Sequence, residues 1–92
     1  MEIKKIQSEW QARGFSGGIW TDPPGQVWKD YVHQEDELFM VIEGAVEIEI
    51  SEKKRWPAAG EEVLISAGTV HTVRNLGATT SRWLYAYKNP SA

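Results

Sequence analysis

The chain has 92 residues, of which 41% are hydrophobic and 25% are charged, and its formal net charge is −3. This length excludes a two-half dinucleotide-binding fold and a β/α barrel of about 250 residues, so we expect one domain over residues 1–92. Because Asp and Glu outnumber Lys and Arg by 13 to 10, the charge gives no support to nucleic-acid binding. The lack of cysteine excludes disulfides and thiolate metal sites.

The apolar residues show no sign of a membrane segment. The longest apolar run, Leu38 to Ile42, is much shorter than the roughly 20 residues that cross a bilayer. Residues 1–5 lack the apolar stretch of a secretory signal peptide. We therefore expect no membrane partner and a cytoplasmic location, with which the lack of cysteine is compatible.

The first predicted element is a short helix over residues 8–13. Ser8 with Gln11 three residues later forms a capping box, and Gly14 is a stop signal. A helix of about two turns is unstable alone, so we expect Trp10 to pack against the rest of the domain.

Beyond residue 18 the hydrophobic pattern changes to a period of two. In residues 27–33 this alternation puts Tyr31 and His33 on one face of a strand and Trp28 on the other. We therefore expect Trp28 to lie outside the fold or in a contact between subunits, which favours a homodimer.

Short strands are expected along the rest of the chain, with a hairpin loop at residues 51–54. They fall at residues 37–43, 45–50, 63–65, 70–74 and 82–87. Strands at this short spacing, separated by turn residues, predict an all-β fold, namely a small antiparallel sandwich or barrel with one short N-terminal helix.

Several aromatic residues fit either a cavity wall or core packing. Phe39 shares the parity of Glu37, and Trp83, Tyr85 and Tyr87 lie on one face of the last predicted strand. Of these last three, we favour one in a cavity wall and the others in packing. The candidate pocket residues are Tyr31, Phe39, Trp83 and Tyr85.

The two histidines are the strongest chemical signal. His33 and Glu37 are separated by a short turn, and His71 lies on a later strand that can face them. Two imidazoles and one carboxylate suit Fe(II), Mn(II), Ni(II) or Zn(II), with coordination positions left for water or substrate. Spacing alone favours the alternative of one surface histidine and one structural histidine.

The pattern resembles the two signature motifs of the cupin superfamily. The first motif matches at its second His, its Glu and its closing Gly, in Tyr31-x-His33-x3-Glu37-x6-Gly44. The second matches except for a Ser at its Pro position, in Gly60-x5-Ser66-x-Gly68-x2-His71-x3-Asn75. The family's first His is Tyr31 in this chain.

The resemblance implies a jelly-roll β-barrel with a divalent metal at His33, Glu37 and His71. It also implies a homodimer and a small-molecule ligand. Tyr31 is then the remaining candidate for a proton donor. The implied function is that of a small metal-binding cupin. One form of this function is a metalloenzyme that acts on a small polar or carboxylated substrate. The alternative is a binding module without catalysis, and the resemblance does not decide between them.

Overall fold

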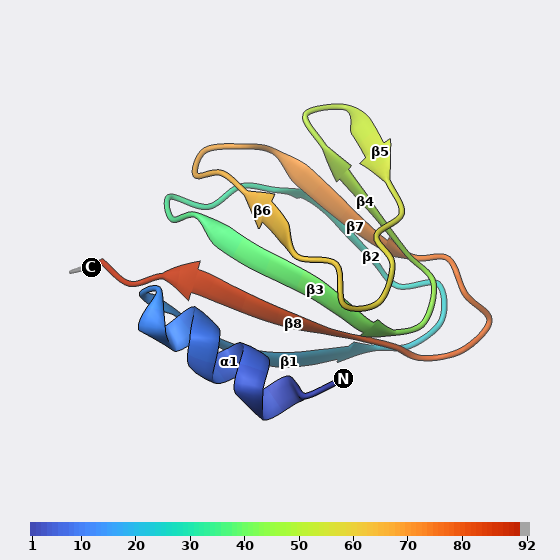
Figure 1. Cartoon of the computed structure of the whole chain (residues 1–92). Coiled ribbons are helices and arrows are strands. Elements are labelled where there is room, and N and C mark those ends of the chain that lie inside the picture. Colours follow the sequence, from blue (N-terminus) through green and yellow to red (C-terminus); the bar gives the residue numbers. More distant parts are fainter. Residues whose placement is uncertain (91–92) are drawn as a thin grey trace.

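The computed structural model describes residues 1–90 and consists of two four-stranded antiparallel sheets with one helix (Figure 1). The elements are α1 (Ile3–Ala12), β1 (Phe15–Asp22), β2 (Val27–Tyr31), β3 (Glu37–Glu43), β4 (Val46–Ile50), β5 (Lys53–Arg55), β6 (Val63–Ile65), β7 (His71–Asn75) and β8 (Ser81–Lys88). One sheet has the order β1-β8-β3-β6 and the other the order β2-β7-β4-β5. The predicted all-β class is confirmed.

The helix begins five residues earlier than predicted. It starts at Ile3 with Glu2 as N-cap, whose side chain makes no capping hydrogen bond, so the capping box at Ser8 is wrong. Ile3, Ile6 and Trp10 instead share one face and pack on the first sheet, and this apolar face decides where the helix forms. Among residues 1–90, no helix is long and apolar enough to cross a membrane.

The strands over residues 37–43 and 63–65 have the predicted bounds, but two strands were not predicted. β5 occupies the second half of the predicted loop, because the turn is closed by Ser51 and Glu52 alone, both with positive φ. β1 runs through Gly17 and thus begins before residue 18, after which the period of two was expected. A Cβ at Gly17 would lie 1.9 Å from the Tyr85 carbonyl oxygen, so the close pairing of β1 with β8 requires glycine there.

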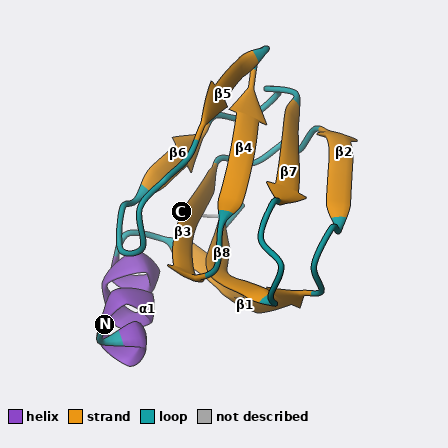
Figure 2. Ribbon diagram, turned by 90° about the vertical axis from the view of Figure 1, so that its right-hand side faces the viewer, coloured by secondary structure: helices purple, strands orange, loops and turns teal. Residues whose placement is uncertain are grey.

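The core has two parts, one on each side of the first sheet. Between the sheets, eight residues pack together: Phe39, Val41, Val46, Ile48, Val63, Ile65, Val73 and Trp83. On the other side, α1 covers a second cluster around Leu38, Met40 and Leu84. Because β3 is buried on both faces, its sequence is a continuous apolar run. Figure 2 shows β2, β7 and β4 as a separate layer from β1 and β8, with α1 far from it.

Candidate metal centre

Three predicted ligand residues converge at one end of the space between the sheets. His33 follows β2, Glu37 is the first residue of β3 and His71 is the first of β7. Glu37 Oε1 lies 3.4 Å from His33 Nε2 and 3.6 Å from His71 Nε2. Each of the three residues offers one ligand atom, and these atoms lie within 4.8 Å of one another. Residues that are distant in the sequence therefore meet at a single point.

The imidazole of His71 is held in the form that binds metals. Its Nδ1 lies 3.1 Å from the carbonyl oxygen of Thr69, to which it donates, so Nε2 keeps its lone pair toward Glu37. The pKa of His71 is lowered, mainly by burial and further by the neighbouring His33. The hydrogen bond to Thr69 acts in the opposite direction and raises it. Burial therefore favours the neutral imidazole, and the hydrogen bond fixes the tautomer whose Nε2 faces Glu37.

Glu37 carries an unsatisfied oxygen at the centre of this group. Its Oε1 is the one buried side-chain oxygen or nitrogen within residues 1–90 that has no hydrogen-bond partner. Burial raises the pKa of Glu37 from 4.5 to about 7. An orphaned carboxylate oxygen that faces two imidazole nitrogens is the arrangement that a divalent cation satisfies. The residues present therefore fit a metal ion that is bound by two nitrogen atoms and one oxygen atom.

Two tyrosines border the centre. Tyr31 pairs with His71 across β2 and β7, and its ring centroid lies 6.2 Å from that of His33. The hydroxyl oxygen of Tyr87 lies 3.5 Å from His33 Nε2. Burial, with a smaller effect of the Glu37 charge, raises the pKa of Tyr87 to about 12. Tyr87 thus keeps its proton, and sequence reasoning gave it no role at the centre.

A cavity of about 320 Å³ opens from the three ligand residues. Its walls are mainly aromatic, and its lining residues are Trp20, Trp28, Tyr31, His33, Glu37, Phe39, His71, Val73, Trp83, Tyr85 and Tyr87. All four candidate pocket residues line it, and Phe39 and Trp83 also belong to the core. All three aromatics of the last strand line the cavity, where one was expected.

The predicted position of Trp28 is wrong. It lines the cavity and packs against the core instead of lying outside the fold. The pairing of β2 with β7 shifts register between Trp28 and Tyr31, and Asp30 within this shift has a φ of 55°. The irregularity breaks the period of two, so Trp28 and Tyr31 face the same cavity. An exposed Trp28 therefore no longer supports a dimer.

Asp22, at the end of β1, was not predicted and holds two walls of the cavity in place. Its Oδ1 accepts a hydrogen bond of 2.6 Å from the indole of Trp20, and its Oδ2 accepts one of 2.7 Å from the indole of Trp28. No local pattern indicates this contact, because Trp28 reaches Asp22 from another sheet.

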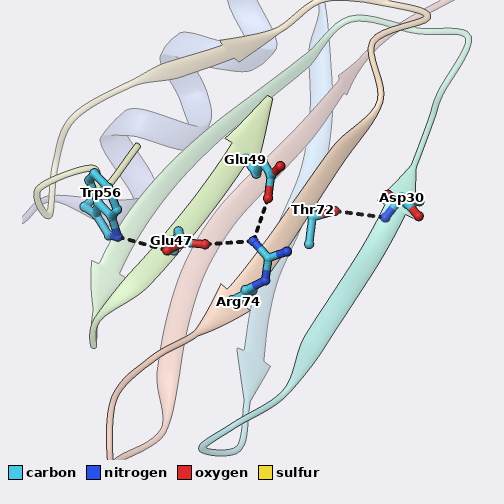
Figure 3. A network of polar contacts seen from close by, with 6 residues as sticks. All are labelled: Asp30, Glu47, Glu49, Trp56, Thr72 and Arg74. Carbon is cyan, nitrogen blue, oxygen red and sulfur yellow. Dashed lines mark hydrogen bonds and ion pairs between the residues drawn. The ribbon is translucent and has the colours of Figure 1, made fainter. Parts of the chain in front are cut away.

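A polar network on the second sheet supports the strands that carry the site (Figure 3). Arg74 donates hydrogen bonds of 2.7 Å to Glu47 and 2.8 Å to Glu49, which ties β7 to β4. The backbone N–H of Asp30 donates to Thr72 Oγ1 at 3.0 Å, which fixes the irregular part of β2 on β7. The network therefore holds β2 and β7 together next to His71 and Tyr31.

Comparisons with known proteins agree with this architecture. The family model described as Cupin domain matches residues 18–87. No curated protein matches the chain by sequence. Among solved structures, the plu4264 protein from Photorhabdus luminescens has a TM-score of 0.76 at 23% identity, and the match covers 85% of this chain and 65% of that one.

Two further solved structures carry names of oxalate enzymes. An oxalate oxidase in complex with glycolate has a TM-score of 0.74 at 23% identity, over 84% of this chain and 43% of that one. A predicted oxalate decarboxylase from Thermotoga maritima has a TM-score of 0.74 at 20% identity, over 89% and 73%. The chain thus spans less than two thirds of the Photorhabdus protein and of the oxidase. At these identities the likeness shows the fold.

Proposed function

The chain belongs to the cupin family, and from this premise we propose that it binds a divalent metal ion and a small organic molecule in one pocket. The family predicted from the two sequence motifs is confirmed. The observation that carries the proposal is the orphaned Glu37 oxygen, which lies 3.4 and 3.6 Å from the two imidazole nitrogens.

His33, Glu37 and His71 would hold the ion, which can be Fe, Mn, Ni or Zn. When bound, such an ion supplies Lewis-acid polarisation of a substrate oxygen or, as iron, reaction with O2. The chain's own groups do the rest. The Thr69 carbonyl orients His71, and the aromatic walls offer the ligand an apolar surface.

The tyrosine hydroxyls are the proton donors of this pocket. Tyr31 remains our proposed donor to a bound substrate, because it stands beside both histidines. Tyr87 is a second one, since its raised pKa keeps the hydroxyl protonated beside His33. In an enzyme these residues would protonate or position a small polar or carboxylated substrate. The names of the two oxalate enzymes support a small carboxylate.

A binding module without catalysis is the second candidate. The residues that line the cavity include neither Lys nor Arg, and Glu37 is the one acidic group among them. A pocket with so few groups for acid–base chemistry favours binding without turnover. Screening Fe(II)- and Mn(II)-loaded protein against diketones, flavonols, keto acids and sugar phosphates separates the two candidates. Turnover that is lost in Glu37→Ala supports the enzyme, and a thermal shift without turnover supports the module.

We also propose the jelly-roll barrel for the two sheets and a homodimer in the cytoplasm. The strand orders β1-β8-β3-β6 and β2-β7-β4-β5 support the jelly roll. The small core supports a dimer, because a chain of this size gains stability from shared burial. Light scattering coupled to gel filtration measures the mass, and a monomer at micromolar concentration contradicts the dimer.

The metal site is tested by elemental analysis. Protein stripped with a chelator is reloaded with Fe(II), Mn(II), Ni(II) or Zn(II), and excess metal is removed by gel filtration. We expect about one ion per chain for the preferred metal. Glu37→Gln should lose it, whereas Glu43→Gln, an exposed glutamate on the same strand, should keep it. Absence of stoichiometric metal in wild-type protein after every reloading contradicts the proposal.

A further inference from the structure

The part of the cavity beyond the metal centre is an aromatic box. The rings of Trp20 and Trp28 lie at 78° with centroids 5.6 Å apart, and Trp20 makes the same angle with Tyr85 at 6.4 Å. Trp28 in turn meets Tyr31 at 60° and 5.9 Å. Rings at such angles form walls of different orientation around one space, instead of a flat stack.

The charges around this box have one sign. Glu37 is the one acidic residue among those that line the cavity, and neither Lys nor Arg is among them. Asp22 contacts the N–H groups of the two indoles. An anionic group in the box would therefore find no positive partner among the lining residues, whereas a cation meets electron-rich ring faces.

Asp22 makes these indoles better partners for a cation. It is 2% exposed, and each of its oxygens accepts one indole N–H. Bonds of 2.6 and 2.7 Å are short and charge-assisted. They fix both rings, and they polarise the indoles so that the ring faces become more negative.

We propose that Trp20, Trp28, Tyr31 and Tyr85 form a subsite for the onium group of a small organic cation, with Asp22 as its positioning residue. A quaternary ammonium or sulfonium group fits it, because such groups bind aromatic faces without needing hydrogen-bond acceptors. The inference deepens the proposed function and rests on it for one point, namely that the other end of the substrate binds at the metal centre. A carboxylate there would reach toward His33, Glu37 and His71, so the substrate class is a small betaine-like zwitterion.

The test compares two probes of equal shape on metal-free protein. Choline and its neutral isostere 3,3-dimethylbutan-1-ol are titrated separately, with tryptophan fluorescence and calorimetry as readouts. We expect choline to bind about tenfold more tightly or better, because the isostere retains the apolar contact but loses the charge. Equal or tighter binding of the isostere overturns the proposal, and so does absence of saturable choline binding.

Variants locate the effect in the box. Trp20→Leu should reduce the preference for choline over the isostere to near unity, and Trp20→Phe should reduce it partly, because it keeps a ring but loses the bond to Asp22. Trp56→Leu is the matched control, since Trp56 is 64% exposed and does not line the cavity. A choline preference that survives in Trp20→Leu overturns the assignment.

The outcome is separable from that of the metal proposal. Choline selectivity is measured without metal, and metal loading is measured without choline. If choline selectivity is found but no metal binds, the metal proposal fails and the onium subsite stands. If metal binds but choline shows no preference, the onium subsite fails alone.

Discussion

Tyr31 and His71 lie directly opposite each other in the pairing of β2 with β7, and their ring centroids are 6.4 Å apart. By the resemblance of its sequence to the cupin motif, Tyr31 stands where that motif has its first histidine. A side chain at this position faces both His33 and His71. A phenol therefore stands beside the two histidines, at a position from which a fourth side chain could reach the proposed metal.

Tyr31→His should therefore add an imidazole to the metal centre and tighten metal binding. We expect the metal affinity to increase by more than the roughly tenfold effect of residues that hydrogen-bond to a metal ligand. Competition of Zn(II) between the protein and a chromogenic chelator measures it. Tyr31→Phe is the control and should leave the metal affinity unchanged, because the Tyr31 hydroxyl is not one of the three proposed metal ligands. A large loss in Tyr31→Phe would instead identify the phenol as a ligand.

Metal removal should lower the stability of the folded chain. A ligand that binds only the native state at about 100 times its Kd adds about 2.7 kcal/mol to the free energy of unfolding. For a domain of this size the melting temperature should then rise by about 10 to 20 °C. Differential scanning calorimetry with Zn(II) and with a chelator measures the shift. His71→Ala should show no shift, and a full shift in that variant places the metal elsewhere.

The stability of the metal-free chain should depend on pH through Glu37. The pKa of its carboxyl is raised by burial from 4.5 to about 7, so the native state holds a proton that the unfolded state has lost. This contribution to stability is complete below pH 4.5 and is lost as pH rises through 7. At about 1.4 kcal/mol per pKa unit, the loss is at most about 4 kcal/mol.

His71 acts in the opposite direction and must be separated from Glu37. Its lowered pKa makes stability fall as pH decreases below 6.5, because the unfolded state takes up a proton first. The quantity to measure is therefore the difference in free energy of unfolding between wild type and Glu37→Gln, by urea denaturation with a chelator present. As pH rises from 4.5 to 7, the wild type should lose stability relative to Glu37→Gln. A constant difference contradicts the raised pKa.

The parts of the fold that could be predicted are those in which local pattern and tertiary structure agree. The strand over residues 37–43 is an unbroken apolar run bounded by Glu37 and Gly44, and it forms as expected because both of its faces are buried. The grouping of His33 and His71 with Glu37 followed from motif spacing, and the structure brings the three together. That they hold a metal stays a prediction.

The errors arose where tertiary contacts override the local pattern. The indole of Trp28 enters the cavity because of one irregularity at Asp30, which a period of two cannot anticipate. The strand through Gly17 was not predicted, because the close approach of the Tyr85 backbone, which leaves no room for a side chain, is a tertiary contact. The role of Asp22 needs two indoles from different sheets, so no segment of sequence contains its signal.

Asn75, the last residue of the second motif, is a buried hydrogen-bonding residue. Its amide nitrogen donates to the carbonyl oxygens of Pro23 at 2.9 Å and Thr79 at 3.1 Å. Its Oδ1 accepts from the N–H of Gly77 and from the hydroxyl of Ser81 at 2.8 Å. At 3% exposure, the side chain therefore joins the connection after β1 to the connection between β7 and β8.

Asn75→Ala should destabilise the chain without changing the metal site. Removal of the amide leaves buried polar groups without partners, each of which costs about 1 to 3 kcal/mol, so we expect a loss of about 2 to 4 kcal/mol in the free energy of unfolding. Urea denaturation measures it, with Asn89→Ala, a partly exposed asparagine, as the control that should change stability by less than about 0.5 kcal/mol. Folded Asn75→Ala should load metal as wild type does, because Asn75 does not line the cavity. An equal effect of both substitutions on stability would show that the hydrogen bonds of Asn75 do not hold these connections together.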